Sequence, residues 1–144
     1  MGNEITNIAI ITARGGSKRI PKKNILDFCG REAYDLLISE QCNAVFPVVQ
    51  YSFPPQRGLY IANGFTIPVS PKDYTKRSQD LTPIYHDCGQ FYFFRTESFR
   101  KTGSVVDGAR PIVVNETEVQ DIDTLTDWKL AEMKYLMRGQ NDLT

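Results

Sequence analysis

Residues 7–18 of the chain read NIAIITARGGSK, and this stretch decides the fold class. Its first part, Asn7–Ala13, is a continuous apolar run rich in β-branched side chains. Such a run predicts a strand buried on both faces of a mostly parallel sheet, as in α/β proteins. The run ends abruptly in two glycines, and Pro21 blocks a helix. Arg14–Lys23 is therefore predicted to be an irregular loop.

This loop contains the residue types that bind phosphate. Adjacent glycines let the backbone approach a ligand closely, so that N–H groups reach phosphate oxygens. Hydroxyl and cationic side chains add donors and positive charge. The residues concerned are Arg14, Gly15, Gly16, Ser17, Lys18, Lys22 and Lys23. The spacing fits neither G-x-x-x-x-G-K-[ST] nor G-x-G-x-x-G, and a solvated basic loop is the alternative interpretation.

The longer string Ile10–Ile25, IITARGGSKRIPKKNI, resembles the opening signature of the cytidylyltransferases that make CMP-sialic acids. The family commonly has proline where this chain has Thr12. The resemblance implies that the loop wraps the triphosphate of CTP. It assigns nucleotide contacts to Arg14, Gly15, Gly16, Ser17, Lys18, Lys23 and Asn24. It also gives catalytic roles to Arg14 and Lys23, because either cation would offset charge on the α-phosphate and the departing pyrophosphate.

Two later segments, Arg77–Tyr92 (RSQDLTPIYHDCGQFY) and Gln120–Thr124 (QDIDT), resemble the branch that activates pseudaminic acid, a bacterial relative of sialic acid. By this resemblance the sugar acid is bound by Arg77, Gln79, His86, Gln90 and Tyr92, with Gly89 in the pocket wall. Polar donors beside an aromatic wall suit a ligand with a carboxylate and hydroxyls. The alternatives are a buried His86–Asp87 pair and core packing of Phe91 and Phe93.

Asp121 and Asp123 are the candidate metal ligands. The segment Glu118–Ile122 is predicted to continue a strand formed by Pro111–Val114. On a strand, residues i and i+2 point to the same face, so the two carboxylates would converge while Ile122 turns into the core. Such a pair predicts a Mg²⁺ site completed by phosphate oxygens and water. In the family the matching pair binds the metal, although Asp-x-Asp alone is a weak pattern.

The other patterns predict one domain, residues 1–144, with an α/β fold and a mixed, mostly parallel sheet flanked by helices. Glu32–Asn43 is predicted to be a helix that turns an apolar face to the sheet. Ala44–Tyr51 is predicted to be a strand in which Pro47 indicates an edge or a bulge. A last helix is predicted from an N-cap at Thr124, paired with Asp127, to an end at Gly139.

The resemblance has a gap after Gly30. There the family carries roughly 80–90 further residues, two or three βα units of a nucleotide-diphospho-sugar transferase-like fold. A sheet without those strands must re-pair, swap with a partner chain or leave edges open. The polar stretch Pro68–Leu81 is predicted to be an extended arm or loop. It resembles the family's dimerising segment, which implies a homodimer.

Composition excludes several classes of protein. The 144 residues are 41% apolar and 24% charged with no net charge, which is ordinary for a globular domain. No apolar run reaches the roughly 18 residues that span a bilayer, and Met1–Thr6 lacks a signal-peptide pattern. We therefore expect a cytoplasmic protein with no membrane partner. The odd, widely spaced set of Cys29, Cys42 and Cys88 predicts reduced thiols.

Charge is distributed unevenly along the chain. Met1–Arg31 holds six cations and two anions, whereas Asn115–Tyr135 holds six anions and two cations. A cationic head and an anionic tail in one domain suit a metal-chelated polyphosphate. Zero net charge without a spread basic face argues against nucleic acid as a partner.

Two functions remain. The first is a cytidylyltransferase that transfers CMP from CTP to a nonulosonic (pseudaminic or sialic-type) acid, with Mg²⁺ as cofactor and pyrophosphate as product. The second is a catalytically inactive family member that acts as a nucleotide-binding or interaction module, which the gap after Gly30 favours. The related deoxy-octulosonate cytidylyltransferases are an alternative family that the chain could resemble. The GGSK and YHDCGQFY segments look less like that family.

Overall fold

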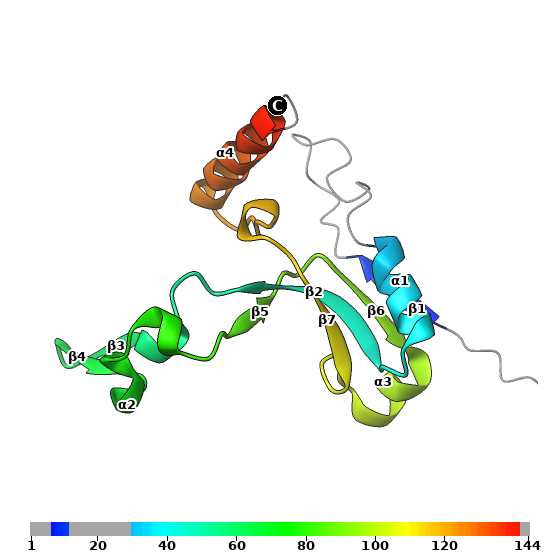
Figure 1. Ribbon diagram of the computed structural model, residues 1–144, viewed down its shortest axis with the longest axis horizontal. Coiled ribbons are helices and arrows are strands. Elements are labelled where there is room, and N and C mark those ends of the chain that lie inside the picture. Colours follow the sequence, from blue (N-terminus) through cyan, green and yellow to red (C-terminus); the bar gives the residue numbers. More distant parts are fainter. Residues whose placement is uncertain (1–6, 12–29, 142–144) are drawn as a thin grey trace, which may run out of the picture.

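The computed structural model describes residues 7–11 and 30–141, and a five-stranded sheet forms the centre of this part (Figure 1). Its strands are β1 (Asn7–Ile11), β2 (Ala44–Gln50), β5 (Tyr85–Asp87), β6 (Phe91–Arg95) and β7 (Ala109–Val113). Strand β2 is central: β5 and β6 pair with successive parts of one edge, and β7 pairs with the other. Strand β1 pairs with β6. The phosphate-binding loop predicted at residues 14–24 lies outside the described residues.

The α/β class is confirmed, but the mostly parallel sheet is wrong. The β1–β6, β2–β5 and β2–β6 pairs are antiparallel, and within the described ranges one pair, β2–β7, is parallel. Asn7 lies opposite Arg95 and Ile11 opposite Phe91. An apolar run predicts burial without specifying which strand will be its neighbour, so the sequence pattern did not reveal this direction of pairing.

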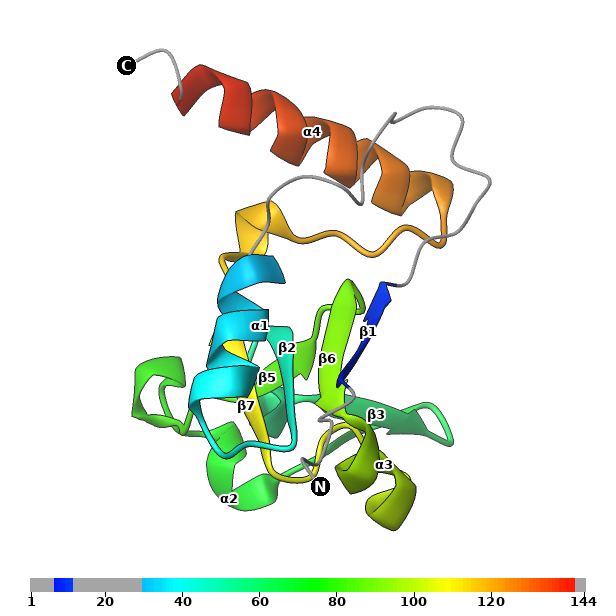
Figure 2. The same ribbon diagram turned by 90° about the vertical axis from the view of Figure 1, so that its right-hand side faces the viewer.

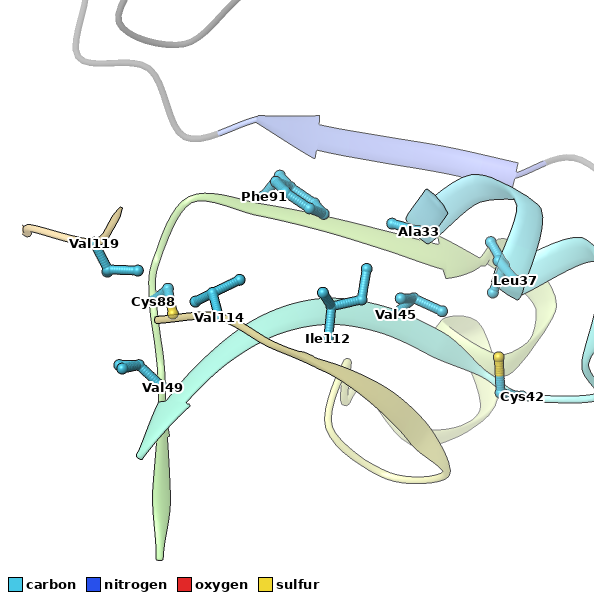
Figure 3. Close-up of a cluster of buried hydrophobic side chains, with 10 residues drawn as sticks. All are labelled: Ala33, Leu37, Cys42, Val45, Val49, Cys88, Phe91, Ile112, Val114 and Val119. Atoms are coloured by element: carbon cyan, nitrogen blue, oxygen red, sulfur yellow. The ribbon is translucent and has the colours of Figure 1, made fainter. Parts of the chain in front are cut away.

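Helix α1 (Gly30–Ser39) packs against the sheet (Figure 2) and buries Ala33 and Leu37 completely. The predicted apolar face is therefore confirmed, although the helix ends at Ser39 rather than Asn43. It packs onto a hydrophobic cluster that spans β2, β6 and β7 (Figure 3). The cluster consists of Ala33, Leu37, Cys42, Val45, Val49, Cys88, Phe91, Ile112, Val114 and Val119. Burying each large aliphatic side chain contributes about 1.5–3 kcal/mol before entropy is counted.

Pro47 lies in the central strand, so the edge interpretation is wrong, and the irregularity lies opposite Pro47, in the run that contains β5 and β6. Val45 pairs with Phe93 and Val48 with Asp87, so two residues of β2 face the five residues 88–92. We call residues Cys88–Gln90 the bulge. The Pro47 carbonyl accepts the Cys88 N–H at 3.2 Å, so the side of Pro47 without a donor also faces the bulge. Proline cannot donate a ladder hydrogen bond, and at Pro47 this missing bond would face the bulge between β5 and β6, where regular pairing is already interrupted.

Residues 51–84, which we call the arm, project from the sheet between β2 and β5 (Figure 1). Strands β3 (Leu59–Ala62) and β4 (Phe65–Pro68) form a hairpin in the arm. Its turn, Asn63-Gly64, has φ angles of 52° and 81°, as an Asn-Gly hairpin turn requires. The predicted loop after β4 instead contains helix α2 (Pro71–Tyr74) and a 3₁₀ turn. At the base of the arm the Tyr51 N–H donates to the Ile84 carbonyl at 3.0 Å.

Beyond β6 the chain forms helix α3 (Thr96–Thr102), strand β7 and helix α4 (Leu125–Asn141). The predicted strand Glu118–Ile122 is wrong: a 3₁₀ turn and irregular chain occupy this stretch. The Asn115 side chain accepts the Thr117 N–H at 3.1 Å, and this cap turns the chain away from the sheet. Helices in the described ranges are not both long and apolar enough to cross a bilayer.

The predicted start of α4 is confirmed, whereas its end is not. The Thr124 N–H donates to the Asp127 carboxylate at 2.7 Å, and the Asp127 N–H donates to the Thr124 hydroxyl at 3.2 Å. This reciprocal pair satisfies donors that the first helical turn leaves without partners. The Thr124 hydroxyl and N–H also hold the pKa of Asp127 below its ordinary value. The helix continues past Gly139 to Asn141.

Candidate functional site

An open pocket of about 420 Å³ lies beside the bulge, where β5 and β2 face the chain that leads into α4. Its lining comes from four separate parts of the chain. The lining residues are Val49, His86, Asp87, Cys88, Gly89, Glu116, Val119, Gln120, Asp121 and Lys134. Three residues predicted from the sequence therefore lie in one pocket: His86 and Gly89, which are close in the chain, and the distant Asp121.

The bulge wall of this pocket is held by the Asp87 carboxylate. Oxygen Oδ1 accepts the Gly89 N–H at 2.7 Å, and Oδ2 accepts the Tyr92 hydroxyl. Gly89 has a φ of +64°, a left-handed conformation that glycine adopts at little cost. Burial, followed by the bond to Asp87, raises the pKa of the Tyr92 phenol well above its ordinary value. The Tyr92 hydroxyl predicted to contact the sugar is thus bonded within the protein.

Cys88 turns from the bulge into the hydrophobic cluster, near Val114 and Val119 (Figure 3). Burial, with a smaller effect of the Asp87 charge, raises the pKa of the Cys88 thiol to about 12. The thiol is therefore protonated at neutral pH and packs as a small apolar side chain. Cys42 is also a buried free thiol.

His86 is exposed, so the alternative of a buried His86–Asp87 pair is wrong. Its Nδ1 lies 3.0 Å from the backbone oxygen of Asp87, and its ring lies 4.6 Å from that of Tyr51. A carbonyl oxygen only accepts hydrogen bonds, so in neutral His86 this contact requires the proton on Nδ1. Nε2 is then the ring nitrogen that can accept a hydrogen bond from a ligand.

The two predicted metal ligands are both exposed, and they lie on irregular chain rather than on a strand. The same-face argument for Asp121 and Asp123 therefore does not apply, although Ile122 is half-buried between them. Asp121 lines the pocket, and the Asp123 N–H donates to the Asp127 carboxylate at 3.2 Å. Within the described ranges, groups of three or more metal-binding side chains are absent. One or two carboxylates still fit Mg²⁺, which takes most remaining ligands from phosphate and water.

The remaining predicted sugar contacts lie apart from one another. Arg77 is in the arm, where it forms a two-bond pair with the Asp80 carboxylate at 2.8 and 3.1 Å. Gln79 belongs to the adjacent 3₁₀ turn, and both residues are exposed and outside the pocket lining. Gln90 is half-buried at the end of the bulge. Phe91 packs in the core as its alternative interpretation predicted, and Phe93 packs against the same cluster.

Three charged residues of the pocket were not predicted as site residues from the sequence: Asp87, Glu116 and Lys134. Lys134 donates from Nζ to the Val119 carbonyl at 2.6 Å, which ties α4 to the chain before it. The pocket thus offers one ammonium group and one imidazole beside three carboxylates.

Comparison with known proteins identifies relatives of the chain. The family model described as cytidylyltransferase matches residues 8–44. A pseudaminic acid cytidylyltransferase of Campylobacter jejuni subsp. jejuni serotype O:23/36 is 33% identical over 121 residues, covering 83% of this chain and 50% of the relative. The protein of the same description from serotype O:2 is 32% identical over 113 residues, covering 77% and 49%.

The chain thus spans about half the length of the curated relatives it matches. The aligned stretches nevertheless cover most of the chain itself, and the identity is too high and too extended for a chance match. Together with the family model on residues 8–44, these matches show that the chain is related to cytidylyltransferases.

Proposed function

We propose that the chain takes part in transfer of CMP from CTP to a nonulosonic acid of the pseudaminic type, with release of pyrophosphate. The observation that carries the proposal is the meeting of His86 and Asp121 in one pocket. His86 comes from the segment that resembles the sugar-binding part of the family, and Asp121 from the segment that resembles its metal-binding part. A pocket that contains both residues would bring a sugar-binding group and a metal-binding group together, as such a reaction needs.

The reaction would be an in-line displacement at phosphorus. An oxygen–phosphorus bond forms from the anomeric hydroxyl of the sugar acid to the α-phosphorus, while the bond to the β-phosphate oxygen breaks. The hydroxyl proton leaves to solvent, and pyrophosphate carries away the electron pair. Magnesium held by Asp121 and Asp123 would lower the pKa of the attacking hydroxyl and offset phosphate charge. Arg14 and Lys23 would stabilise the departing pyrophosphate.

The pocket side chains would orient the sugar acid. Lys134 attracts the ligand's carboxylate, whereas Nε2 of His86 and the carboxylate of Glu116 accept hydrogen bonds from its hydroxyls. As part of this proposal we place the protein in the cytoplasm, where CTP is available. The rival proposal is a family member that binds nucleotide without turnover, and the internal gap in the resemblance after Gly30 favours it.

Calorimetric titration of CTP with Mg²⁺ tests the proposal. We expect metal-dependent binding that the double variant Asp121→Asn/Asp123→Asn weakens by at least about tenfold, or roughly 1.4 kcal/mol. Asp35→Asn/Asp107→Asn is the matched control, because it removes two exposed charges away from the pocket and should bind CTP as the unmodified chain does. Chelation of Mg²⁺ should abolish the difference between the two double variants.

Release of pyrophosphate on adding pseudaminic acid separates the two proposals. Turnover supports the transferase, whereas metal-dependent CTP binding without turnover supports the non-catalytic module. A folded chain that binds no CTP would contradict both. Equal losses in the two double variants would contradict the assignment of the metal to Asp121 and Asp123.

The arm supports a homodimer as the working form. Its hairpin carries exposed apolar side chains on both faces, including Ile61 and Phe65, which are 76% and 75% exposed. An isolated two-stranded hairpin is marginal in water, so these faces require a partner surface. The family resemblance, which concerns residues 68–81 of the arm, implies a second copy of this chain as the partner.

Phe65→Asp should therefore weaken self-association by at least about tenfold, because it places a charge in the buried interface. Asn63→Asp is the control: it adds the same charge to the same hairpin and keeps an Asx-Gly turn. Sedimentation equilibrium measures both dissociation constants. A monomeric unmodified chain, or equal effects of the two variants, would contradict dimerisation through the arm.

A further inference from the structure

The bulge interrupts the sheet at the place where it forms the pocket wall. Across it, five residues of the β5–β6 run face two residues of β2, so the regular ladder cannot fix the backbone there. The Asp87 side chain contributes to fixing it, beside the backbone hydrogen bond from the Cys88 N–H to the Pro47 carbonyl. The two oxygens of Asp87 bind the Gly89 N–H inside the bulge and the Tyr92 hydroxyl beyond it. Asp87 thus links the start, middle and far side of the bulge.

The far side of this link is firmly placed. The backbone of Tyr92 pairs with Ile10 of β1, and its ring packs on Phe46 of β2 with centroids 5.6 Å apart. Its phenol stays protonated at neutral pH, because burial and the neighbouring carboxylate both raise its pKa. The hydroxyl is therefore a permanent donor, anchored to two other strands, on which Asp87 can position the bulge.

Asp87, at the other end of this hydrogen bond, lies among residues that line the pocket. His86, Asp87, Cys88 and Gly89 are consecutive and all line the pocket. The His86 ring is oriented through its contact with the Asp87 backbone oxygen. A displacement of Asp87 would therefore move both the imidazole and the bulge wall.

The hydrogen bonds of Asp87 argue against a direct contact between its carboxylate and the sugar acid. A carboxylate that binds the hydroxyls of the sugar acid needs an oxygen that is free to accept their hydrogen bonds. Both oxygens of Asp87 are instead engaged by donors from its own strand run. The arrangement is that of a group used to shape the wall of a site.

We infer that Asp87 and Tyr92 are positioning residues: their hydrogen bond fixes the Cys88–Gln90 bulge and the His86 ring as the wall against which the sugar acid binds. The sugar part of this inference rests on the proposed function. It gives Tyr92 a role different from the direct sugar contact that the family resemblance implied, and it adds Asp87, which the resemblance did not mark.

Asp87→Asn, Tyr92→Phe and the double variant test the link in the free protein. Asparagine has one acceptor oxygen and cannot serve both donors, and phenylalanine keeps the ring packing on Phe46 while removing the hydroxyl. We expect the Gly89 amide to exchange with solvent about tenfold faster in each single variant, with no further increase in the double variant. Tyr85→Phe, on the exposed part of β5, should leave this rate unchanged.

Kinetics then separate positioning from general stability. With an active chain, the KM for pseudaminic acid should rise about tenfold or more in Asp87→Asn and Tyr92→Phe, while the KM for CTP changes less than about twofold. Equal increases in both KM values would indicate a loss of folded protein and overturn the positioning role. An unchanged sugar KM, with faster Gly89 exchange, would overturn the sugar wall.

The free-protein measurement keeps the two proposals distinguishable. If the chain binds neither CTP nor pseudaminic acid, the proposed function fails and the sugar wall fails with it. Faster Gly89 exchange in the two variants would then still establish the link between Asp87 and Tyr92. Exchange equal to that of the unmodified chain in both single variants would overturn the link itself, whatever the activity.

Discussion

Replacing Arg95 by methionine should lower the free energy of unfolding by about 2–4 kcal/mol. The Arg95 guanidinium donates to the Leu37 carbonyl at 2.6 Å, to that of Cys42 at 2.9 Å and to that of Glu40 at 3.3 Å. These carbonyls lie at the C-terminal end of α1 and just beyond it, where a helix leaves acceptors without partners and a cation is favoured. Methionine keeps the apolar stem but removes every donor.

Urea denaturation followed by circular dichroism measures this change, and Arg110→Met is its control. Arg110 also ties the end of α1 to a strand, through the Glu40 carboxylate at 2.7 Å, but both side chains of this pair are well exposed to solvent. An exposed pair of this kind contributes about 0–1 kcal/mol. Comparable losses in the two variants would show that charge alone, and not the half-buried carbonyl contacts, stabilises this corner.

Leu37→Ala should be the most destabilising of the conservative changes, at about 2–5 kcal/mol. The Leu37 side chain is 0% exposed and lies between α1 and the sheet, in contact with the cluster in Figure 3. Shortening it leaves a cavity that the rigid sheet cannot close. Against a total stability of about 5–15 kcal/mol for a domain, this is a large fraction.

Ile38→Ala is the matched control for this prediction. Ile38 is the next residue of the same helix, is of equal size and is 47% exposed. Its truncation should lower the free energy of unfolding by less than about 1 kcal/mol in the same titration. If Ile38→Ala were as destabilising as Leu37→Ala, the face of α1 that packs on the sheet would have been assigned wrongly.

Local patterns predicted the local structure well. The β-branched run at 44–51 became β2, the apolar face of α1 was identified through Ala33 and Leu37, and Thr124 pairs with Asp127 at the start of α4. In each case the physical cause is short-range: side-chain periodicity, or a cap that bonds to its own helix. These features do not depend on what the rest of the chain does.

The errors concern partners that lie far away in the chain. The direction of β1 in the sheet is set by β6, because Asn7 pairs with Arg95, a residue more than eighty positions later in the chain. The apolar run of β1 does not indicate which strand will pair with it. The predicted strand Glu118–Ile122 failed because the Asn115 cap redirects the chain. Helix α3 was missed because Thr96–Thr102 is short and polar, and its clear mark is the left-handed Gly103 that ends it.

The candidate site divides in the same way. Resemblance to the family marked His86 and Asp121, and the pocket contains both. Asp87 was passed over because its role lies in two hydrogen bonds across an irregular bulge, which no spacing rule describes. The assignments to Arg14–Asn24 stay predictions, since these residues lie outside the described part of the chain.

The closed base of the arm has a consequence for how such a chain can evolve. The Tyr51–Ile84 hydrogen bond continues the β2–β5 ladder, so the arm is the loop of a β-hairpin, enlarged until it has structure of its own. The entropic cost of closing a loop grows slowly with its length. A lineage can therefore lengthen, shorten or redecorate this insertion without shifting the register of either strand. The surface that the arm presents can in this way change while the strands beside the pocket stay as they are.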